Sequence, residues 1–264
     1  MPKISVIMGC YNSGQRVIAA IESIQKQTFS DWEFIICDDS STDDTYNILL
    51  NLSSFDPRVI IIKNNKNLKL GATLNNCLSV SSGEYIARMD DSDFSYPHRF
   101  ELQNNFLDDN PDYAIVSSAH IIYNESGESV IRKGVEYPCK KSFLWGTPFC
   151  HAASFFRRDA LLSVNGYRIA KETCRTEDYD LFMRLYANGY KGYNIQEALY
   201  RYYLPLDGMK KRRLIKYRIN EAIVRYKGFK SLGLLPLGLP YVFKPIVVSL
   251  FPHRILQFLH NKGI

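Results

Sequence analysis

The chain has 264 residues, of which 46% are hydrophobic and 23% are charged. This composition is ordinary for a folded protein and excludes disorder as the main state. A chain of this length buries one sizeable core, so we expect one α/β domain with an appended segment rather than two full domains.

The net charge of +6 is distributed unevenly along the chain. From Lys191 onward 14 basic residues stand against 3 acidic ones, a net charge of +11, whereas the first 190 residues carry −5. An acidic body with a basic C-terminal segment predicts contact with an anionic partner such as phospholipid headgroups. Nucleic acid is disfavoured as a partner, because the basic residues lead into an apolar run interrupted by prolines (232–251) and form no known groove-reading motif.

Six cysteines are spread along the chain without a C-x-x-C pair, and several of them sit in apolar runs. This pattern predicts buried, reduced thiols. The sequence opens on a strand-like run, Ile4 to Met8, with no charged leader and apolar signal segment before it. We therefore expect a cytoplasmic protein.

Four short β-branched runs in the first hundred residues predict strands at 4–8, 33–37, 59–62 and 85–89. The amphipathic stretches between them predict helices, the first capped by Asn12 or Ser13 and the second by a capping box at 41–44. This alternation is typical of a mainly parallel α/β sheet with helices on both faces, which binds its ligands at the carboxyl ends of the strands.

Polar residues follow three of these strands directly. Tyr11 and Asn12 follow the first strand, Asp39 follows the second, and the run from Asp90 to Asp93 follows the fourth. Because the carboxyl ends of parallel strands share one edge of the sheet, we expect the three loops to converge on one crevice.

The densest acidic cluster contains Asp90, Asp91 and Asp93. Carboxylates so close together repel one another, and a hard cation such as Mg²⁺ or Mn²⁺ between them would relieve this and also hold a diphosphate. The alternative is a solvated acidic turn that caps a helix beginning near Pro97. The carboxylate of Asp39 suits a uracil imide or a ribose hydroxyl, although paired Asp residues after a strand also occur in signalling receiver domains.

Beyond Tyr113 the pattern is less regular, with a strand at 114–118 and a helix after Asp178. Glu177 and Asp178 lie where a loop meets this helix, and one of them is a candidate general base for an acceptor hydroxyl. The alternative is that acidic residues simply favour a helix N-terminus. His151 is a further candidate, although a lone histidine is more often a structural residue.

Four motifs in order resemble the family 2 glycosyltransferases of the GT-A fold, over roughly residues 3 to 205. The most specific match is the run 85–100, YIARMDDSDFSYPHRF, which is similar to the family's YIARMDADDISLPHRL. The other three motifs are the first-strand run with Tyr11 and Asn12, the segment 38–45, and the segment 177–185.

The resemblance implies a role for each matching position. Tyr11, Asn12 and Asp39 would hold the nucleoside of a nucleotide-sugar donor, most simply a UDP-sugar. Residues that would border the donor diphosphate and its Mg²⁺ or Mn²⁺ are Arg88, Asp90, Asp91 and Asp93. On the acceptor side, Asp178 would be the catalytic base of an inverting displacement, with Glu177 and His151 shaping the site.

Three positions depart from the family pattern. Ser92 replaces the commonest metal-ligating aspartate, which shifts ligation to Asp91 or Asp93. Lys69 stands where relatives often place glycine, and the segment 199–203 lacks the Arg-x-His ending of some relatives. The rival functions are a sugar nucleotidyltransferase, whose Gly-rich phosphate loop is missing near the N-terminus, and a catalytically inactive GT-A-like membrane assembly protein.

These observations divide the chain into a catalytic domain, residues 1–205, and a basic, apolar C-terminal segment, residues 206–264. Prolines cut the apolar run into pieces too short to span a bilayer, so we expect in-plane association with the inner face of the cell membrane. The alternative is that the apolar residues pack against the catalytic domain or a second subunit. The acceptor implied by the resemblance is a glycan or lipid-linked glycan of capsule or O-antigen type; the oligomeric state is left open.

Overall fold

The computed structural model describes residues 1–205 and 214–250. Its strands are β1 Ile4–Cys10, β2 Trp32–Asp38, β3 Val59–Lys63, β4 Tyr85–Arg88, β5 Phe94–Ser95, β6 Tyr113–Tyr123, β7 Ser129–Arg132, β8 Phe155–Arg157 and β9 Lys191–Tyr203. Its α-helices are α1 Arg16–Gln25, α2 Thr45–Ser53, α3 Leu70–Val80, α4 Arg99–Asp109, α5 Arg158–Ser163, α6 Glu177–Ala187, α8 Ile215–Ser231 and α9 Leu239–Leu250. Three 3-10 helices, η1 Lys140–Leu144, η2 His151–Ala153 and η3 Lys171–Thr173, complete the secondary structure of these residues.

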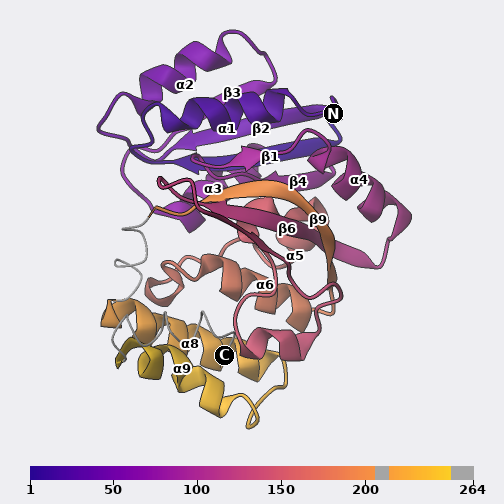
Figure 1. Cartoon of the computed structure of the whole chain (residues 1–264), viewed down its shortest axis with the longest axis vertical. Coiled ribbons are helices and arrows are strands. Elements are labelled where there is room, and N and C mark those ends of the chain that lie inside the picture. The colour runs from indigo at the N-terminus through magenta and orange to yellow at the C-terminus, as the bar shows by residue number, and fades with distance from the viewer. Residues whose placement is uncertain (206–213, 251–264) are drawn as a thin grey trace.

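One sheet with the strand order β3-β2-β1-β4-β8-β6-β9-β5 runs through the molecule, and β7 pairs with β6 at its side (Figure 1). The four N-terminal strands β3, β2, β1 and β4 are parallel, as the alternating pattern predicts. From β8 onward the sheet is mixed, since β8 runs antiparallel to β4 and β6 whereas β9 runs parallel to β6. The less regular pattern beyond Tyr113 therefore corresponds to the mixed half of the sheet.

The expected strands are all present, but two expected helix caps are wrong. Gln15 occupies the N-cap position of α1. Asn12 and Ser13 instead bind the neighbouring loop. Asn12 Oδ1 accepts from the Thr42 amide at 2.9 Å, and the Ser13 amide donates to Thr45 Oγ1 at 2.9 Å. At α2, no side-chain cap bond forms at Asp44.

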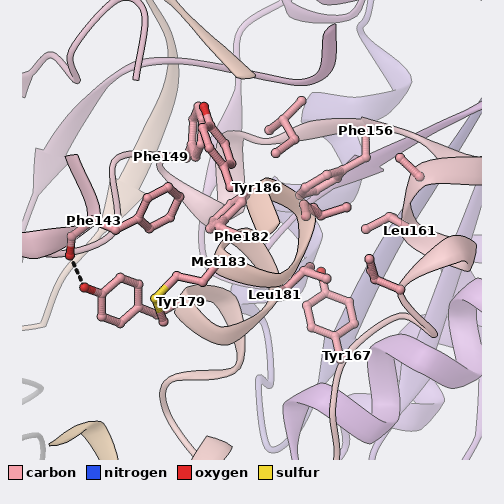
Figure 2. Packing of buried hydrophobic residues seen from close by; sticks show 14 of the residues in the cluster. Phe143, Phe149, Phe156, Leu161, Tyr167, Tyr179, Leu181, Phe182, Met183 and Tyr186 are labelled. Carbon is pink, nitrogen blue, oxygen red and sulfur yellow. Dashed lines mark hydrogen bonds between the residues drawn. The ribbon is translucent and has the colours of Figure 1, made fainter. Parts of the chain in front are cut away.

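Two apolar layers cover the two faces of the sheet. One layer contains α1 and the β1 residues Ile4, Val6 and Met8, and the other contains α3, α5 and α6 with Ile7. Around α6 the second layer is rich in aromatic side chains, which Figure 2 shows closely packed: Phe143, Phe149, Phe156, Phe182 and Tyr186. This packing holds the first turn of α6 in a defined place beside the sheet.

Helices α8 and α9 continue the second layer, and α6 lies between them and the sheet (Figure 1). Gly228 of α8 approaches α6 so closely that a Cβ there would lie 2.2 Å from Met183 Sδ. Apolar C-terminal residues that are buried here are Phe229, Leu232, Leu234 and Val242. Part of the C-terminal segment thus packs against the catalytic domain, which is the alternative that the sequence left open.

Other residues of α8 and α9 remain exposed, and within 1–205 and 214–250 no helix has the length and apolar character needed to cross a membrane. The basic run Lys210 to Arg213, on which the membrane prediction partly depends, lies outside the described residues. All six cysteines are unpaired, and Cys10, Cys37 and Cys77 are buried, as expected for reduced thiols.

Candidate active site

Two cavities lie beside each other at the carboxyl ends of β1, β2 and β4. The smaller, of about 310 Å³, is lined by residues that include Tyr11, Asp39 and the run from Asp90 to Asp93. The larger, of about 710 Å³, is lined by residues that include His151, Glu177 and Asp178. Asp90 lines both cavities, as do Leu70 and Tyr202. The loops expected to converge therefore do so, and Asp90 lies on the wall between the two spaces.

Asp39, at the end of β2, is buried and bonded to the loop that precedes α3. Its Oδ1 accepts from the Leu68 amide at 2.7 Å and from Asn64 Nδ2 at 2.8 Å, and its Oδ2 accepts from the Lys69 amide at 2.9 Å. A carboxylate oxygen accepts two hydrogen bonds, so Oδ2 retains capacity for a ligand. Lys69 has φ +72°, a conformation that favours glycine, which gives a physical reason for the glycine of the family pattern at this position.

The two residues expected beside Asp39 are placed differently. The ring of Tyr11 is half exposed at the smaller cavity. Asn12 lines neither cavity; with φ +52° its side chain turns to the Thr42 amide. This contact fixes Asn12 against the 41–45 loop through its Oδ1 atom, and its contact with a bound nucleoside stays a prediction.

Arg88 is fully buried under the acidic cluster and donates to the Met89 carbonyl and to Asp90 Oδ1. Burial opposes the charged guanidinium, yet the Asp90 carboxylate outweighs it and raises the pKa of Arg88. A buried guanidinium that stays charged fixes the Asp90 side chain and compensates part of the negative charge of the cluster.

The other two acidic side chains of the cluster have raised pKa values because they are buried. Asp91 accepts a hydrogen bond from Ser13 Oγ, which opposes the rise in its pKa. Asp93 accepts from the Tyr203 amide through Oδ1 at 2.8 Å, and burial and the Asp90 charge raise its pKa well above the usual range. Its Oδ2 is buried without a hydrogen-bond partner.

These side chains fit a hard divalent ion that arrives with a diphosphate. Among the described residues no group of three His, Cys, Asp or Glu side chains is arranged to hold an ion by itself. Mg²⁺, however, is usually held by one or two carboxylates together with substrate phosphates. The orphaned Asp93 Oδ2 and the carboxylate of Asp91, both lining the smaller cavity, supply that donor set.

The larger cavity contains the acceptor-side candidates. Glu177 is the first residue of α6, and burial together with the adjacent Asp178 raises its pKa to about 7. His151 Nε2 lies 2.8 Å from the hydroxyl of Tyr167, and burial and the Arg88 charge lower the pKa of His151 well below its usual value. The larger cavity thus contains the neutral imidazole of His151 and the Glu177–Asp178 carboxyl pair. Near neutral pH, Glu177 is partly protonated.

Several residues of the site were not singled out in the sequence. Arg99 lies beneath the cluster and donates from Nη2 to the Arg88 carbonyl at 2.8 Å, and the Tyr200 hydroxyl accepts from the Asp90 amide at 3.1 Å. Arg99 belongs to the conspicuous run 85–100, whereas nothing in the sequence links Tyr200 to Asp90. The larger cavity is also lined by cations that carry no motif: Arg132, Lys133, Arg175, Arg218 and Arg225.

Comparison with known proteins identifies relatives along the whole chain. The family model described as "Glycosyl transferase family 2" matches residues 5–164. EpsE of Bacillus subtilis (strain 168) is 38% identical over 264 residues, which cover 100% of this chain and 95% of the relative. The UDP-Gal:alpha-D-GlcNAc-diphosphoundecaprenol beta-1,3-galactosyltransferase of Escherichia coli is 31% identical over 245 residues, covering 87% of this chain and 84% of the relative.

Solved structures show the same fold. TarS of S. aureus in complex with UDP-GlcNAc superposes with a TM-score of 0.74 at 17% identity and covers 92% of this chain and 73% of its own. The mannosyltransferase PcManGT of Pyrobaculum calidifontis, in complex with GDP-Man and Mn2+, superposes with a TM-score of 0.68 at 16% identity, covering 99% of this chain and 79% of its own. At these identities the likeness concerns the fold alone.

Proposed function

Because the chain belongs to glycosyl transferase family 2, and is therefore a glycosyltransferase, we propose that it transfers one sugar from a UDP-sugar to an acceptor hydroxyl, with inversion at the anomeric carbon. One observation carries this proposal: Asp90 lines both cavities, so the acidic cluster and the Glu177–Asp178 pair border adjacent spaces. Inverting transfer needs donor and acceptor on opposite sides of the reacting carbon, and two spaces that share a wall provide that arrangement.

The smaller cavity is the proposed donor site. Tyr11 offers an exposed ring to the nucleobase, and Asp39 Oδ2 retains an acceptor position for an imide or a ribose hydroxyl. Asn12 stays in the proposal as a support for the 41–45 loop. The E. coli relative uses UDP-Gal by its name, and the TarS complex contains UDP-GlcNAc, which favours uridine in the donor.

Arg88 and Asp90 border the proposed diphosphate position, and Asp91 and Asp93 are the proposed ligands of Mg²⁺ or Mn²⁺. When bound, such an ion offsets the negative charge that develops on the leaving nucleoside diphosphate. Ser92 is a neutral, weaker ligand, so the two aspartates on either side of it carry the role. The Mn2+ of the PcManGT complex supports a divalent ion in this fold.

Asp178 is the proposed general base that takes the proton of the acceptor hydroxyl as the hydroxyl oxygen attacks the anomeric carbon. Because the pKa of Glu177 is raised to about 7, this residue retains a proton in much of the population near neutral pH. We assign the role of base to Asp178, because a protonated Glu177 cannot accept the hydroxyl proton. Neutral His151, hydrogen-bonded to Tyr167, completes the acceptor side.

The proposed acceptor is a lipid-linked glycan, because the E. coli relative is named for a GlcNAc-diphosphoundecaprenol acceptor. An acceptor on a lipid requires the enzyme at a membrane surface. Support comes from exposed apolar side chains on α8 and α9, which include Ile215, Ile219, Ile223, Phe243 and Val247. We therefore propose that residues 206–264 associate with the anionic inner face of the cell membrane, while residues 1–205 form the catalytic domain.

A panel of nucleotide sugars, each incubated with Mn²⁺ and a mixed pool of lipid-diphosphate saccharides, tests the proposal through the release of free nucleoside diphosphate. We expect release of UDP, dependent on acceptor and abolished by excess chelator. Full activity in chelator would remove the metal from the mechanism. Absence of turnover with every donor and acceptor would instead favour the inactive assembly protein, and release of pyrophosphate from a nucleoside triphosphate would favour the nucleotidyltransferase.

A further inference from the structure

The larger cavity contains more positive charge than its acidic residues neutralise. On α8, Glu221 contacts Arg218 at 2.7 Å and Arg225 at 3.0 Å, so the carboxylate of Glu221 is already engaged. Lys133, after β7, and Arg175, before α6, also line the cavity. In the described ranges 1–205 and 214–250, neither of these two cations pairs with a carboxylate. This part of the cavity is therefore suited to an anion.

Arg175 has a backbone conformation that favours glycine. Its φ is +69°, in the turn between η3 and α6, where the Thr176 amide donates to the Thr173 carbonyl at 2.9 Å. The guanidinium lies over the ring of Tyr217 of α8, 4.9 Å from its centroid, and the side chain stays exposed to the cavity. The turn alone would be better formed by glycine, so this strained position indicates a use for the side chain.

The position of Arg175 relative to Asp178, the proposed base, indicates which molecule carries the anion. Arg175 and Asp178 are three positions apart in the sequence, so their Cα atoms are at most about 11 Å apart, a span that one sugar ring with its anomeric phosphate bridges. Neither Arg175 nor Lys133 lines the smaller cavity proposed for the donor. An anion bound by Arg175 therefore belongs to the molecule whose sugar reaches Asp178, which is the acceptor.

A stripe of exposed apolar residues runs along α8, the helix that carries Tyr217. Ile215, Ile219 and Ile223 repeat every four residues and are 52%, 46% and 39% exposed. Residues four apart on a helix lie on one face. Tyr217 and Glu221, which line the larger cavity, lie on the opposite side of α8, so the stripe is a surface separate from the cavity.

We propose that Arg175, assisted by Lys133, binds the diphosphate that joins the acceptor sugar to its lipid. This inference rests on the proposed function and specifies its acceptor: the enzyme recognises a sugar diphospholipid rather than any sugar hydroxyl. Planar guanidinium groups bind phosphate oxygens in pairs, which suits this role.

Binding of undecyl diphosphate, titrated calorimetrically with saturating UDP and Mn²⁺ so that the donor side is filled, tests the proposal without turnover. We expect Arg175→Gly to weaken binding by about tenfold or more, as for loss of a charge-assisted hydrogen bond. The same variant should melt no lower than the native protein, because glycine relieves the φ of +69° and keeps the backbone amide that bonds to Glu177.

Two matched variants distinguish the loss of the Arg175 side chain from the general effects of relieving a strained backbone or removing a positive charge. Asn165→Gly relieves a similar φ of +57° outside both cavities, and Lys230→Gln removes one exposed charge of α8 outside them. Both should bind undecyl diphosphate within twofold of the native protein. Binding by Arg175→Gly within twofold of native, or an equal loss in Lys230→Gln, would overturn the proposal.

A second measurement distinguishes this inference from the underlying function. The KM for a sugar diphosphoundecyl acceptor should rise in Arg175→Gly, while the KM for the matched undecyl glycoside without diphosphate should not change. Equal effects on both acceptors would overturn the subsite and leave the transferase activity standing. A different outcome would overturn the proposed function and leave the anion site standing. In that case the native protein would turn over neither acceptor, while its binding of undecyl diphosphate would still depend on Arg175.

Discussion

Glu177 and Asp178 are consecutive residues at the start of α6, and both line the larger cavity. Burial and the neighbouring charge raise the pKa of Glu177 to about 7. A pair of interacting carboxyl groups shares its protons, so the residue that holds a proton near neutrality leaves the other as the available base. This division of roles cannot be inferred from two adjacent acidic letters in the sequence.

Asp178→Asn tests this assignment. The amide cannot accept the hydroxyl proton, so turnover should fall at least about a hundredfold, whereas donor binding, measured by calorimetry, should stay within twofold. Asp159→Asn, an exposed acidic position on α5, is the control. Near-normal turnover of the Asp178 variant would transfer the role to Glu177.

The raised pKa of Glu177 also predicts a pH dependence of stability. The folded state keeps the proton up to about pH 7, whereas the unfolded state releases it near the ordinary glutamate pKa of 4.5. This contribution to the free energy of unfolding is therefore complete below pH 4.5 and is lost as the pH rises to about 7.

The substitution Glu177→Gln should remove this pH-dependent loss of stability, because glutamine does not ionise. Urea denaturation at intervals between pH 4.5 and 7.5 should show the native protein losing stability relative to the variant as the pH rises. Parallel curves for the two proteins would show that Glu177 ionises normally in the folded state.

At the scale of elements, the N-terminal half of the sheet was predictable and the C-terminal half was not. The runs that became β1 to β4 are β-branched and separated by amphipathic helices, so periodicity located both the strands and the edge where their loops meet. The GT-A fold expected from the four motifs is confirmed by the TM-scores of 0.74 and 0.68.

The parts of the site that could not be predicted depend on contacts between residues far apart in the sequence. Tyr200 lies under the Asp90 loop because β9 pairs with β6 across the sheet, and no local pattern encodes a pairing between segments this far apart in sequence. The hydrogen bond between Asn12 Oδ1 and the Thr42 amide likewise joins two loops that are far apart in sequence. Lys133 and Arg175 belong to no motif, and only the shape of the larger cavity brings them together.

The contact between α8 and α6 gives a prediction at this scale. A Cβ at position 228 would lie 2.2 Å from Met183 Sδ and 2.4 Å from its Cε. Because Met183 is buried and cannot move aside freely, Gly228→Ala should reduce the free energy of unfolding by about 1–3 kcal/mol, despite the better helix propensity of alanine.

Gly146→Ala is the matched control, since a Cβ at position 146 would meet no atom within 4 Å. Its effect in urea denaturation should stay within about 0.5 kcal/mol. Equal stability of the two variants would mean that α8 is not firmly packed on α6.

At the scale of the whole molecule, the C-terminal segment has two sides. Buried residues such as Phe229 and Val242 attach it to the catalytic domain, whereas Phe243 and Val247 of α9 are 57% and 49% exposed. Removing the segment would therefore uncover core residues, so point substitutions are a cleaner test of membrane association than truncation.

Flotation with anionic and neutral liposomes makes this test. The native protein should float with anionic vesicles at low salt and less at high salt, and the double substitution Phe243→Ser and Val247→Ser should weaken binding. Val130→Ser, at an exposed position of β7, should not. A native protein that ignores anionic vesicles at low salt would leave the exposed residues of α9 to a protein interface.

The proposed function depends on two adjacent cavities, at whose shared edge a donor sugar at the acidic cluster meets an acceptor activated by Asp178. The most direct measurement is an NMR analysis of the product formed from a UDP-α-sugar and a sugar diphospholipid, with the released UDP quantified in the same sample. We predict one added sugar in β-linkage for each UDP released. A product in α-linkage, or release of UDP with the acceptor unchanged, would contradict the account.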